Sequence, residues 1–274
     1  MVRFSFCLSY RLARALAVAA IMMAATLGCL LASAAAYASS LDFAPTTFRV
    51  FAADGTTVIG TTRFTFNGDD GGLELIGSES HYNNGSYDHE EDRLQPPKKA
   101  GGLPTQLSFN HHFFHADGSP DRTINADFVT GKAACTTYIG GRPDVKTATI
   151  TFPKDTYAGG SVTIPLRSGF MESPAKPVIF HYFTCMPGPR LVGIRALPSP
   201  PSPWNHYPGR IVQVQLQPDF GWLSSAVAAF LPNIRAWLDP AQRWNVVGVE
   251  TTRYYKGITT LLVAEQPRAV SSSR

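Results

Sequence analysis

The sequence predicts a mainly β protein, an antiparallel meander that forms a curved sheet, half-barrel or open barrel, with one short helix near residues 220–231. The chain contains 23 Gly, 21 Pro, 17 Phe and 10 Tyr, and charged residues make up only 16% of it, which is typical of short strands joined by tight turns. Apolar runs follow one another closely, with Gly, Asn, Asp and Pro between them and not helical stretches. Residues 211–217 alternate between apolar side chains and Gln, as a half-buried strand does.

The strands can be placed in order along the chain. The first group is expected at 47–51, 57–66, 73–82 and a polar strand that ends at Arg93, and the second at 106–115, 122–128, 132–139 and 145–152. Further strands are expected at 160–167, 178–184, 190–197, 211–217, 233–238, 244–254 and 258–263. The Pro-rich stretch 198–208 is read as a long surface loop within one domain, and the helix is expected between Asp219, as N-cap, and Pro232.

Residues 1–38 are read as a cleavable signal peptide. Arg3, Arg11 and Arg14 precede an Ala-rich apolar run that ends at Ala38 in a small-x-small pattern, the preferred cleavage site, with Ala34 and Ala36 as alternatives. A retained membrane anchor is the rival interpretation, and a lipoprotein modified at Cys29 is a weaker one. The predicted organisation is therefore a signal peptide at 1–38, one β domain at 39–266 and a disordered tail at 267–274, in the periplasm or secreted.

Removal of the signal segment changes the charge. The formal net charge of +4 loses three arginines and no acid, which leaves +1. A protein that binds nucleic acid is expected to carry a clustered basic face, so no nucleic-acid partner is predicted.

Two cysteines, Cys135 and Cys185, remain after cleavage. In an oxidising compartment a disulfide between them is favoured, and it would close a loop of about 50 residues, worth roughly 4 kcal/mol. Two buried thiols are the alternative. The chain contains no Cys-x-x-Cys pair that would indicate redox chemistry.

A histidine cluster suggests a metal site. His111 and His115 share one face of a strand with Phe113, and His112 points to the other face. Two histidines four positions apart on a strand lie roughly 13 Å apart, too far for one zinc ion unless the strand bends. We therefore interpret the cluster mainly as polar and aromatic residues at the open end of a hairpin, without a ligand. The alternative is a metal site at His111, His112 and His115, completed by His81, His89 or His181.

The acidic run at residues 87–92 has carboxylates that could hold calcium, but it lacks the glycine-punctuated spacing of a calcium loop. We expect a solvated strand edge, charged to resist unwanted pairing.

Large aromatic side chains suggest either a sandwich core or an apolar ligand site on a curved sheet covered by the 220–231 helix. The candidate ligand-binding residues are Phe109, Phe113, Tyr182, Trp222, Phe230 and Trp237.

Four short segments carry a family resemblance. The stretch 152–159, preceded by Thr130-Gly131-Lys132, and the segments 234–239 and 249–253 resemble an uncharacterised family of exported bacterial β domains. The resemblance covers roughly residues 45–264, and the Pro-rich stretch 198–208 departs from it. It implies a curved sheet of the kind used by periplasmic lipid and lipoprotein carriers, and it brings no catalytic residues.

No catalytic motif is present, so the prediction leans away from an enzyme, with no catalytic residue and no cofactor. The first hypothesis is an envelope protein that binds an apolar or lipid-like ligand on its sheet. A structural or protein-interaction module with an envelope protein partner is second. A metal-dependent or other hydrolase, which needs the histidines to converge with Asp117, His81 or His181, is third. Membrane contact is expected only if the N-terminal segment is retained.

Overall fold

The computed structural model describes residues 46–68, 74–97, 102–219, 234–253 and 257–265. Apart from Gly102, these belong to one compact unit, formed by Phe43–Pro97 and Leu103–Arg274. The predicted signal peptide, the predicted helix at 220–231 and the predicted tail lie outside the described residues. None of the described helices is both long and apolar enough to cross a membrane.

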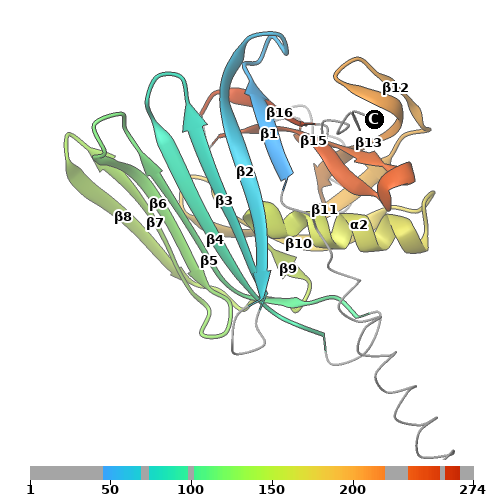
Figure 1. The fold of residues 1–274 in the computed structure, drawn as a ribbon. Coiled ribbons are helices and arrows are strands. Elements are labelled where there is room, and N and C mark those ends of the chain that lie inside the picture. Colours follow the sequence, from blue (N-terminus) through green and yellow to red (C-terminus); the bar gives the residue numbers. More distant parts are fainter. Residues whose placement is uncertain (1–45, 69–73, 98–101, 220–233, 254–256, 266–274) are drawn as a thin grey trace, which may run out of the picture. The chain divides into compact units, whose positions relative to one another are not determined.

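The described chain is mainly β, as predicted (Figure 1). Its strands are β1 (Thr46–Phe51), β2 (Val58–Gly68), β3 (Glu74–Tyr82), β4 (Tyr87–Gln95), β5 (Thr105–Phe114), β6 (Pro120–Asp127), β7 (Lys132–Ile139), β8 (Arg142–Thr149), β9 (Thr156–Tyr157), β10 (Val178–Cys185), β11 (Pro189–Pro198), β12 (Ser202–Trp204), β13 (Tyr207–Pro218), β14 (Ile234–Asp239), β15 (Asn245–Thr252) and β16 (Thr259–Ala264).

The strands form one large curved sheet that does not close on itself. Its order is β8-β7-β6-β5-β4-β3-β2-β1-β16-β15-β14-β13-β11-β10-β9, and β12 pairs with β13. Every pairing among the described strands is antiparallel except that of β9 with β10. The meander prediction is therefore confirmed, and the pairing of β1 with β16 joins the two runs of the meander.

Side chains and one disulfide join the two ends of the sheet where the backbone does not. The predicted disulfide is present: Cys135 on β7 is bonded to Cys185 at the end of β10, with the Cα atoms 5.9 Å apart. Next to it lies an apolar cluster that we call the seam cluster; it consists of Phe109, Ala126, Ala133, Ala158 and Phe183, with Ile124, Phe128, Ile150 and Phe152 packed against it.

A helix replaces one predicted strand. Residues 160–167 were expected to be extended, but they form the end of a 3₁₀ turn, η2 (Gly159–Val162), and the start of α2 (Thr163–Glu172). Pro165 lies in the first turn of α2, where its missing N–H would have no partner within the helix in any case. Leu166 and Phe170, four residues apart, share the buried face, so tertiary packing overrides the β-like run at 162–164.

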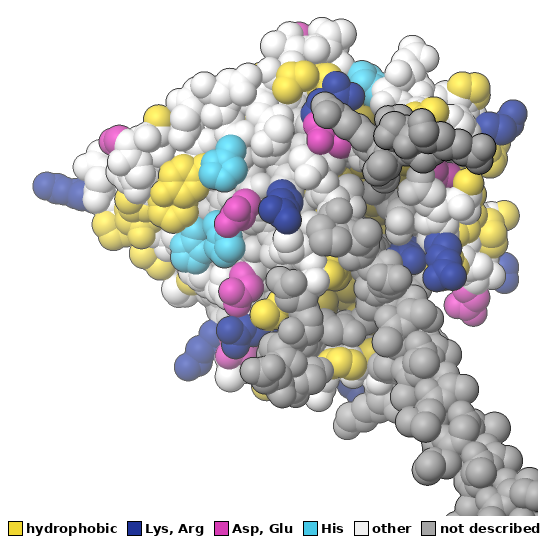
Figure 2. All heavy atoms as spheres, viewed as in Figure 1, with side chains coloured by type: hydrophobic (Ala, Val, Ile, Leu, Met, Phe, Trp, Pro, Cys, Tyr) yellow, Lys and Arg dark blue, Asp and Glu magenta, His cyan; other side chains and the backbone are white. Residues whose placement is uncertain are grey.

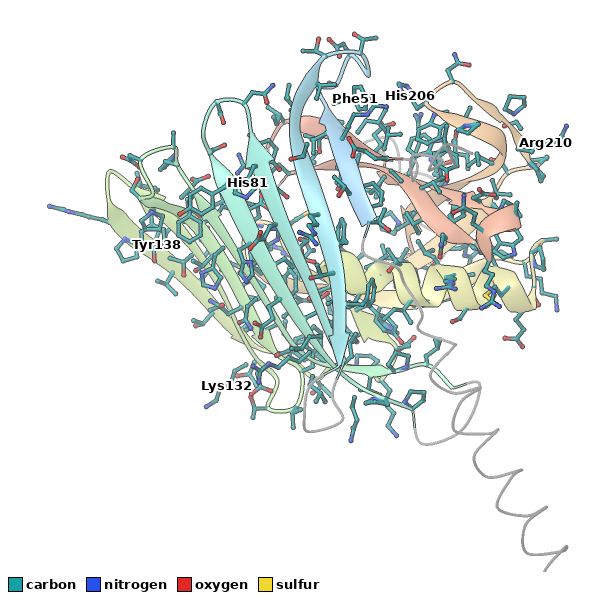
Figure 3. All side chains as sticks on the ribbon, in the orientation of Figure 1. Phe51, His81, Lys132, Tyr138, His206 and Arg210 are labelled. Atoms are coloured by element: carbon teal, nitrogen blue, oxygen red, sulfur yellow. A yellow bond between two sulfur atoms is a disulfide. The ribbon has the colours of Figure 1, made fainter. Side chains whose placement is uncertain are left out.

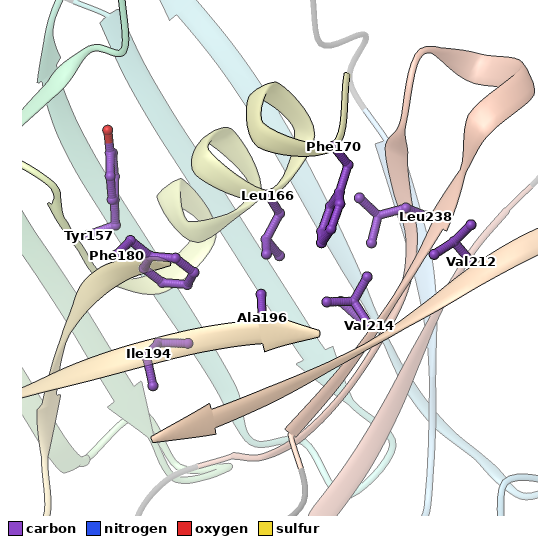
Figure 4. Packing of buried hydrophobic residues seen from close by; sticks show 10 residues of the cluster. Tyr157, Leu166, Phe170, Phe180, Ile194, Ala196, Val212, Val214 and Leu238 are labelled. Carbon is purple, nitrogen blue, oxygen red and sulfur yellow. The ribbon is translucent and has the colours of Figure 1, made fainter. Parts of the chain in front are cut away.

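The main core lies between α2 and the half of the sheet that contains β10, β11, β13 and β14. Leu166 and Phe170 point from α2 towards Ala196 and Val214 (Figure 4). The alternation predicted for 211–217 is confirmed, because Val212 and Val214 are buried in this core. A second cluster lies at the β12–β13 hairpin, where Trp204 stacks on Trp237 at 4.5 Å between ring centroids.

The Pro-rich stretch 198–208 is therefore more ordered than the predicted surface loop. It contains β12, whose Ser202 pairs with Ile211, and it places Trp204 in an apolar cluster. Proline is tolerated because β12 pairs on one side only.

Candidate functional site

A cavity of about 400 Å³ lies inside the curved sheet. Its walls come from both runs of the meander and from the start of the helical segment. One wall, from β10, β11, β13, β14, β15 and β16, is mostly apolar; it includes Val192, Ile194, Leu216, Ala236, Val246 and Leu262.

The opposite wall is built by β2 to β7, and strand register arranges its side chains in rows. The first row runs across Thr137, Arg122, Phe113, Asp88, Ser80 and Thr62. The second row runs across Cys135, Ile124, His111, Glu90, Ser78 and Phe64. The third row runs across Ala133, Ala126, Phe109, Asp92, Ile76 and Phe66. Every member of the first two rows lines the cavity, whereas only Phe109 of the third row does.

β4 places one carboxylate in each of these rows. All three are buried, so the prediction of a solvated, charged strand edge is wrong. β4 lies between β3 and β5, and Asp88, Glu90 and Asp92 are only 4%, 5% and 0% exposed. Because they are two residues apart, all three point to the same face of the sheet. Figure 2 shows the other charged side chains as single acidic and basic groups, mixed with histidines, on the face that it draws.

His111 connects two of these carboxylates. Its Nε2 lies 3.1 Å from Asp88 Oδ1, and its Nδ1 lies 3.2 Å from Glu90 Oε2. A neutral imidazole carries one proton, so it can donate to only one carboxylate, whereas an imidazolium can donate to both. The geometry therefore favours a protonated His111 between two acids. The ring also stacks on Phe113, with 4.0 Å between centroids.

Arg253, directly after β15, approaches the same group. Its Nε lies 3.4 Å from Asp88 Oδ2, and its Nη1 donates to Ser86 Oγ at 3.2 Å. The guanidinium carbon lies 4.0 Å from the ring centroid of Tyr82 and 5.7 Å from that of Phe113. Nε and Nη2 are buried without a hydrogen-bond acceptor in the part of the chain that the structure describes. Arg253 is therefore an ion-pair partner of Asp88 with unused donor capacity.

Glu90 and Asp92 hold the turn that leads into α2. The Gly160 N–H donates to Glu90 Oε1 at 2.6 Å, and the Ser161 N–H donates to Asp92 Oδ2 at 3.0 Å. Gln106 on β5 adds to this contact, since its Oε1 accepts from the Ala158 N–H at 2.7 Å. Buried carboxylates thus satisfy backbone donors at the start of the helical segment, which would otherwise be unpaired.

The environment shifts the pKa of each group differently. Burial raises the pKa of Asp92 well above its usual range, and the charge of Glu90 adds to this; burial also raises the pKa of Glu90. For Asp88, burial is outweighed by the His111 hydrogen bond and the charges of His111 and Arg253, which together lower its pKa. For His111, burial opposes the charged form, but the hydrogen bond to Asp88 and the charge of Glu90 raise its pKa. The surroundings therefore favour the ionised form of Asp88 and the protonated form of Asp92.

The predicted ligand residues do not all meet in the cavity. Phe109, Phe113 and Tyr182 line it, and burial raises the pKa of Tyr182 to about 12. Trp237 lies elsewhere, in the cluster at the β12–β13 hairpin. Trp222 and Phe230 lie outside the described residues.

The predicted histidine metal set is not brought together. His111 faces the cavity, His112 pairs across strands with His89, and His115 is exposed in the turn after β5. Within the described ranges, no group of three or more His, Cys, Asp or Glu side chains has the geometry to hold a metal ion. His181 pairs instead with Asp155, at 2.9 Å.

Several groups at the site were missed by the sequence reasoning. The alternation of acids at positions 88, 90 and 92 was a signal that all three share one face. Arg253 carried no signal, because its place beside Asp88 depends on how β15 and β4 meet in the fold. Both nitrogens of His111 face carboxylates, so these carboxylates already occupy the positions at which a general base would meet a substrate proton.

Comparisons with known proteins found a similar solved structure but no matching family. No protein-family model matches the chain, and no curated protein does. A crystal structure of a β-barrel-like protein of domain of unknown function DUF1849 from Brucella abortus is similar, with a TM-score of 0.45 and 11% sequence identity, over 81% of this chain and 95% of that one.

Proposed function

We propose that the protein is an exported, non-enzymatic binding protein that holds an amphipathic small molecule in the cavity of its curved sheet. The observation that carries this proposal is one cavity with two chemically different walls, one mostly apolar and one mostly polar, with buried charged groups. Its volume of about 400 Å³ lies in the range of small-molecule sites, roughly 300–1,000 Å³. An amphipathic molecule can satisfy both walls at once.

Export rests on separate support. The disulfide between Cys135 and Cys185 is of a kind that persists in oxidising compartments. The Ala-rich segment at 1–38 has the pattern of a signal peptide.

The first test is native mass spectrometry of the gently purified protein, followed by organic extraction of anything bound. A stoichiometric amphipathic molecule is the expected result. If the protein is recovered empty, titration with dodecanol and dodecanoate follows, and the absence of binding of both would overturn the proposal.

A matched pair of variants locates the binding. Val192 lines the cavity, so Val192→Trp should fill it and abolish binding, whereas Ile179→Trp adds the same bulk at a side chain that is 60% exposed on β10. Urea unfolding of both variants controls for the overpacking cost of about 1–3 kcal/mol. Equal loss of binding in both variants, or in neither, would contradict a site in this cavity.

A further inference from the structure

The charged side chains of the cavity wall indicate which headgroup a ligand would carry. Of the described residues that line the cavity, four are Lys or Arg, namely Arg122, Lys146, Arg235 and Arg253, and two are acidic, namely Asp88 and Glu90. Arginine stays protonated at any physiological pH. The lining therefore contains more basic than acidic side chains. Two of the arginines also have an acidic neighbour outside the lining: Arg122 Nε lies 3.9 Å from Asp121 Oδ1, and Arg235 Nη1 lies 3.7 Å from Glu250 Oε2.

Both acids are already compensated within the protein. The two oxygens of Asp88 face His111 and Arg253, and those of Glu90 face His111 and the Gly160 N–H. A cationic headgroup would have to compete with these internal partners. The acids thus hold the site together and leave little unpaired negative charge for a ligand.

Two arginines flank Phe113, which lies in the first of the three rows described above. Arg122 is the cross-strand neighbour of Phe113, a relationship that places Cβ atoms about 5 Å apart. Arg253 comes from the opposite side, with its guanidinium 5.7 Å from the centroid of the Phe113 ring. Guanidinium groups match the oxygen pairs of a carboxylate or a phosphate.

From this arrangement, and on the basis of the proposed function, we infer that the cavity takes an amphiphile with one anionic headgroup, held between Arg122 and Arg253. The apolar tail lies against the wall that contains Ile194, Leu216 and Leu262. Thr62, Ser78 and Ser80 also line the cavity and make this wall more polar, and the Thr62 hydroxyl donates to Ser80 Oγ at 3.0 Å.

The test compares ligands with one tail and different headgroups. The purified protein is titrated by calorimetry with dodecanoate, dodecyl phosphate, dodecanol and dodecylamine. The two anions should bind at least about tenfold more tightly than dodecanol, as expected for one charge-assisted hydrogen bond. Dodecylamine should bind most weakly. Comparing dodecanoate with dodecyl phosphate shows whether the site prefers a carboxylate or a phosphate headgroup. Tighter binding of either one supports the inference.

Variants then locate the headgroup. Arg122→Met should lower the affinity for dodecanoate about tenfold and leave that for dodecanol unchanged. Arg210→Met is the matched control, because Arg210, labelled in Figure 3, is exposed on the β12–β13 hairpin and does not line the cavity. Arg253→Lys gives a second measurement that keeps the positive charge beside Asp88, and it should weaken dodecanoate binding while the protein stays folded by circular dichroism.

The outcomes separate the two proposals. Equal binding of all four probes, or tightest binding of dodecylamine, would overturn the anionic headgroup and leave the proposed function in place. Binding of none of them would overturn both. An unchanged affinity of both arginine variants for dodecanoate would also overturn the headgroup site.

Discussion

The two walls of the cavity belong to halves of one sheet that bury different kinds of side chain. The half with β10, β11, β13 and β14 buries aliphatic side chains under α2 and forms a packed core. The half with β2 to β6 buries Asp88, Glu90 and Asp92 and leaves a cavity beside them. In this structure one half of the sheet contributes a packed apolar core, and the other half contributes a buried polar network beside the cavity.

The polar half is tolerated because each carboxylate has at least one specific partner, although Asp92 Oδ1 is buried without a hydrogen-bond partner among the described residues. A buried charge without a partner costs several kcal/mol, whereas a carboxylate that accepts from a backbone N–H or pairs with His or Arg does not. In this half the partners come from far along the chain: His111 from β5, Gly160 and Ser161 from η2, and Arg253 from directly after β15. The apolar half needs no such partners.

The largest expected effect is in the packed half. Phe170 on α2 is fully buried in the main core, so Phe170→Ala should lower the free energy of unfolding by about 3–5 kcal/mol. Urea unfolding followed by tryptophan fluorescence measures it, with Met171→Ala, at an exposed neighbouring position, as control. A loss below about 1 kcal/mol would mean that α2 does not cover this half in solution.

The seam between the halves comes next. Replacing both Cys135 and Cys185 by Ser should cost about 2–4 kcal/mol, because the open chain regains the freedom that the cross-link removes. Unfolding of the wild type with and without reductant provides the comparison. If reduction and replacement leave stability unchanged, the seam cluster alone joins the two ends of the sheet.

The turn that the acids hold should be less costly to disturb. Gly159 has a positive φ of 52°, and a Cβ there would collide with Glu90 and Phe109. Gly159→Ala should therefore lose about 1–3 kcal/mol. Gly140→Ala is the control for conformation alone, since Gly140 has a similar positive φ, of 57°, but nothing lies near its Cβ. Equal losses would show that the contact with Glu90 contributes nothing.

The smallest effect on stability is expected at Asp92, together with a change in pH dependence. Its raised pKa means that the folded protein holds a proton that the unfolded chain releases above its pKa of about 4, so its contribution to stability falls as pH rises. His111 acts in the same direction, with a contribution that is full below about pH 6.5 and is lost as pH rises through its raised pKa.

Asp92→Asn should therefore be within about 1 kcal/mol of the wild type near pH 5, and should lose less stability than the wild type towards about pH 9. Urea unfolding at several pH values measures both slopes. A large loss at every pH would indicate that Asp92 is ionised in the folded protein and that its charge is needed.

Much of the strand pattern could be predicted, because strands with one buried face leave a period of two in the sequence. Val212, Val214 and Leu216 are an example, and all three pack in or against the main core. The helix at 163–172 was missed because the run Val162-Thr163-Ile164 is typical of strands, and only its packing on β10 and β15 favours the helical form. The candidate site could be predicted only in part: Phe109, Phe113, Tyr182 and His111 line the cavity, whereas Trp237 does not.

The fold class and the favoured pair of cysteines could be read from the sequence, since alternation, turn residues and the number of cysteines are local or compositional properties. Whether the acids of residues 87–92 are solvated or buried depends on the assembled fold. Their neighbours on β3 and β5, the turn at Gly160 and the guanidinium of Arg253 come from distant parts of the chain. A charge is stable in a protein interior only when such partners surround it, and that is a property of the assembled sheet and not of any one strand.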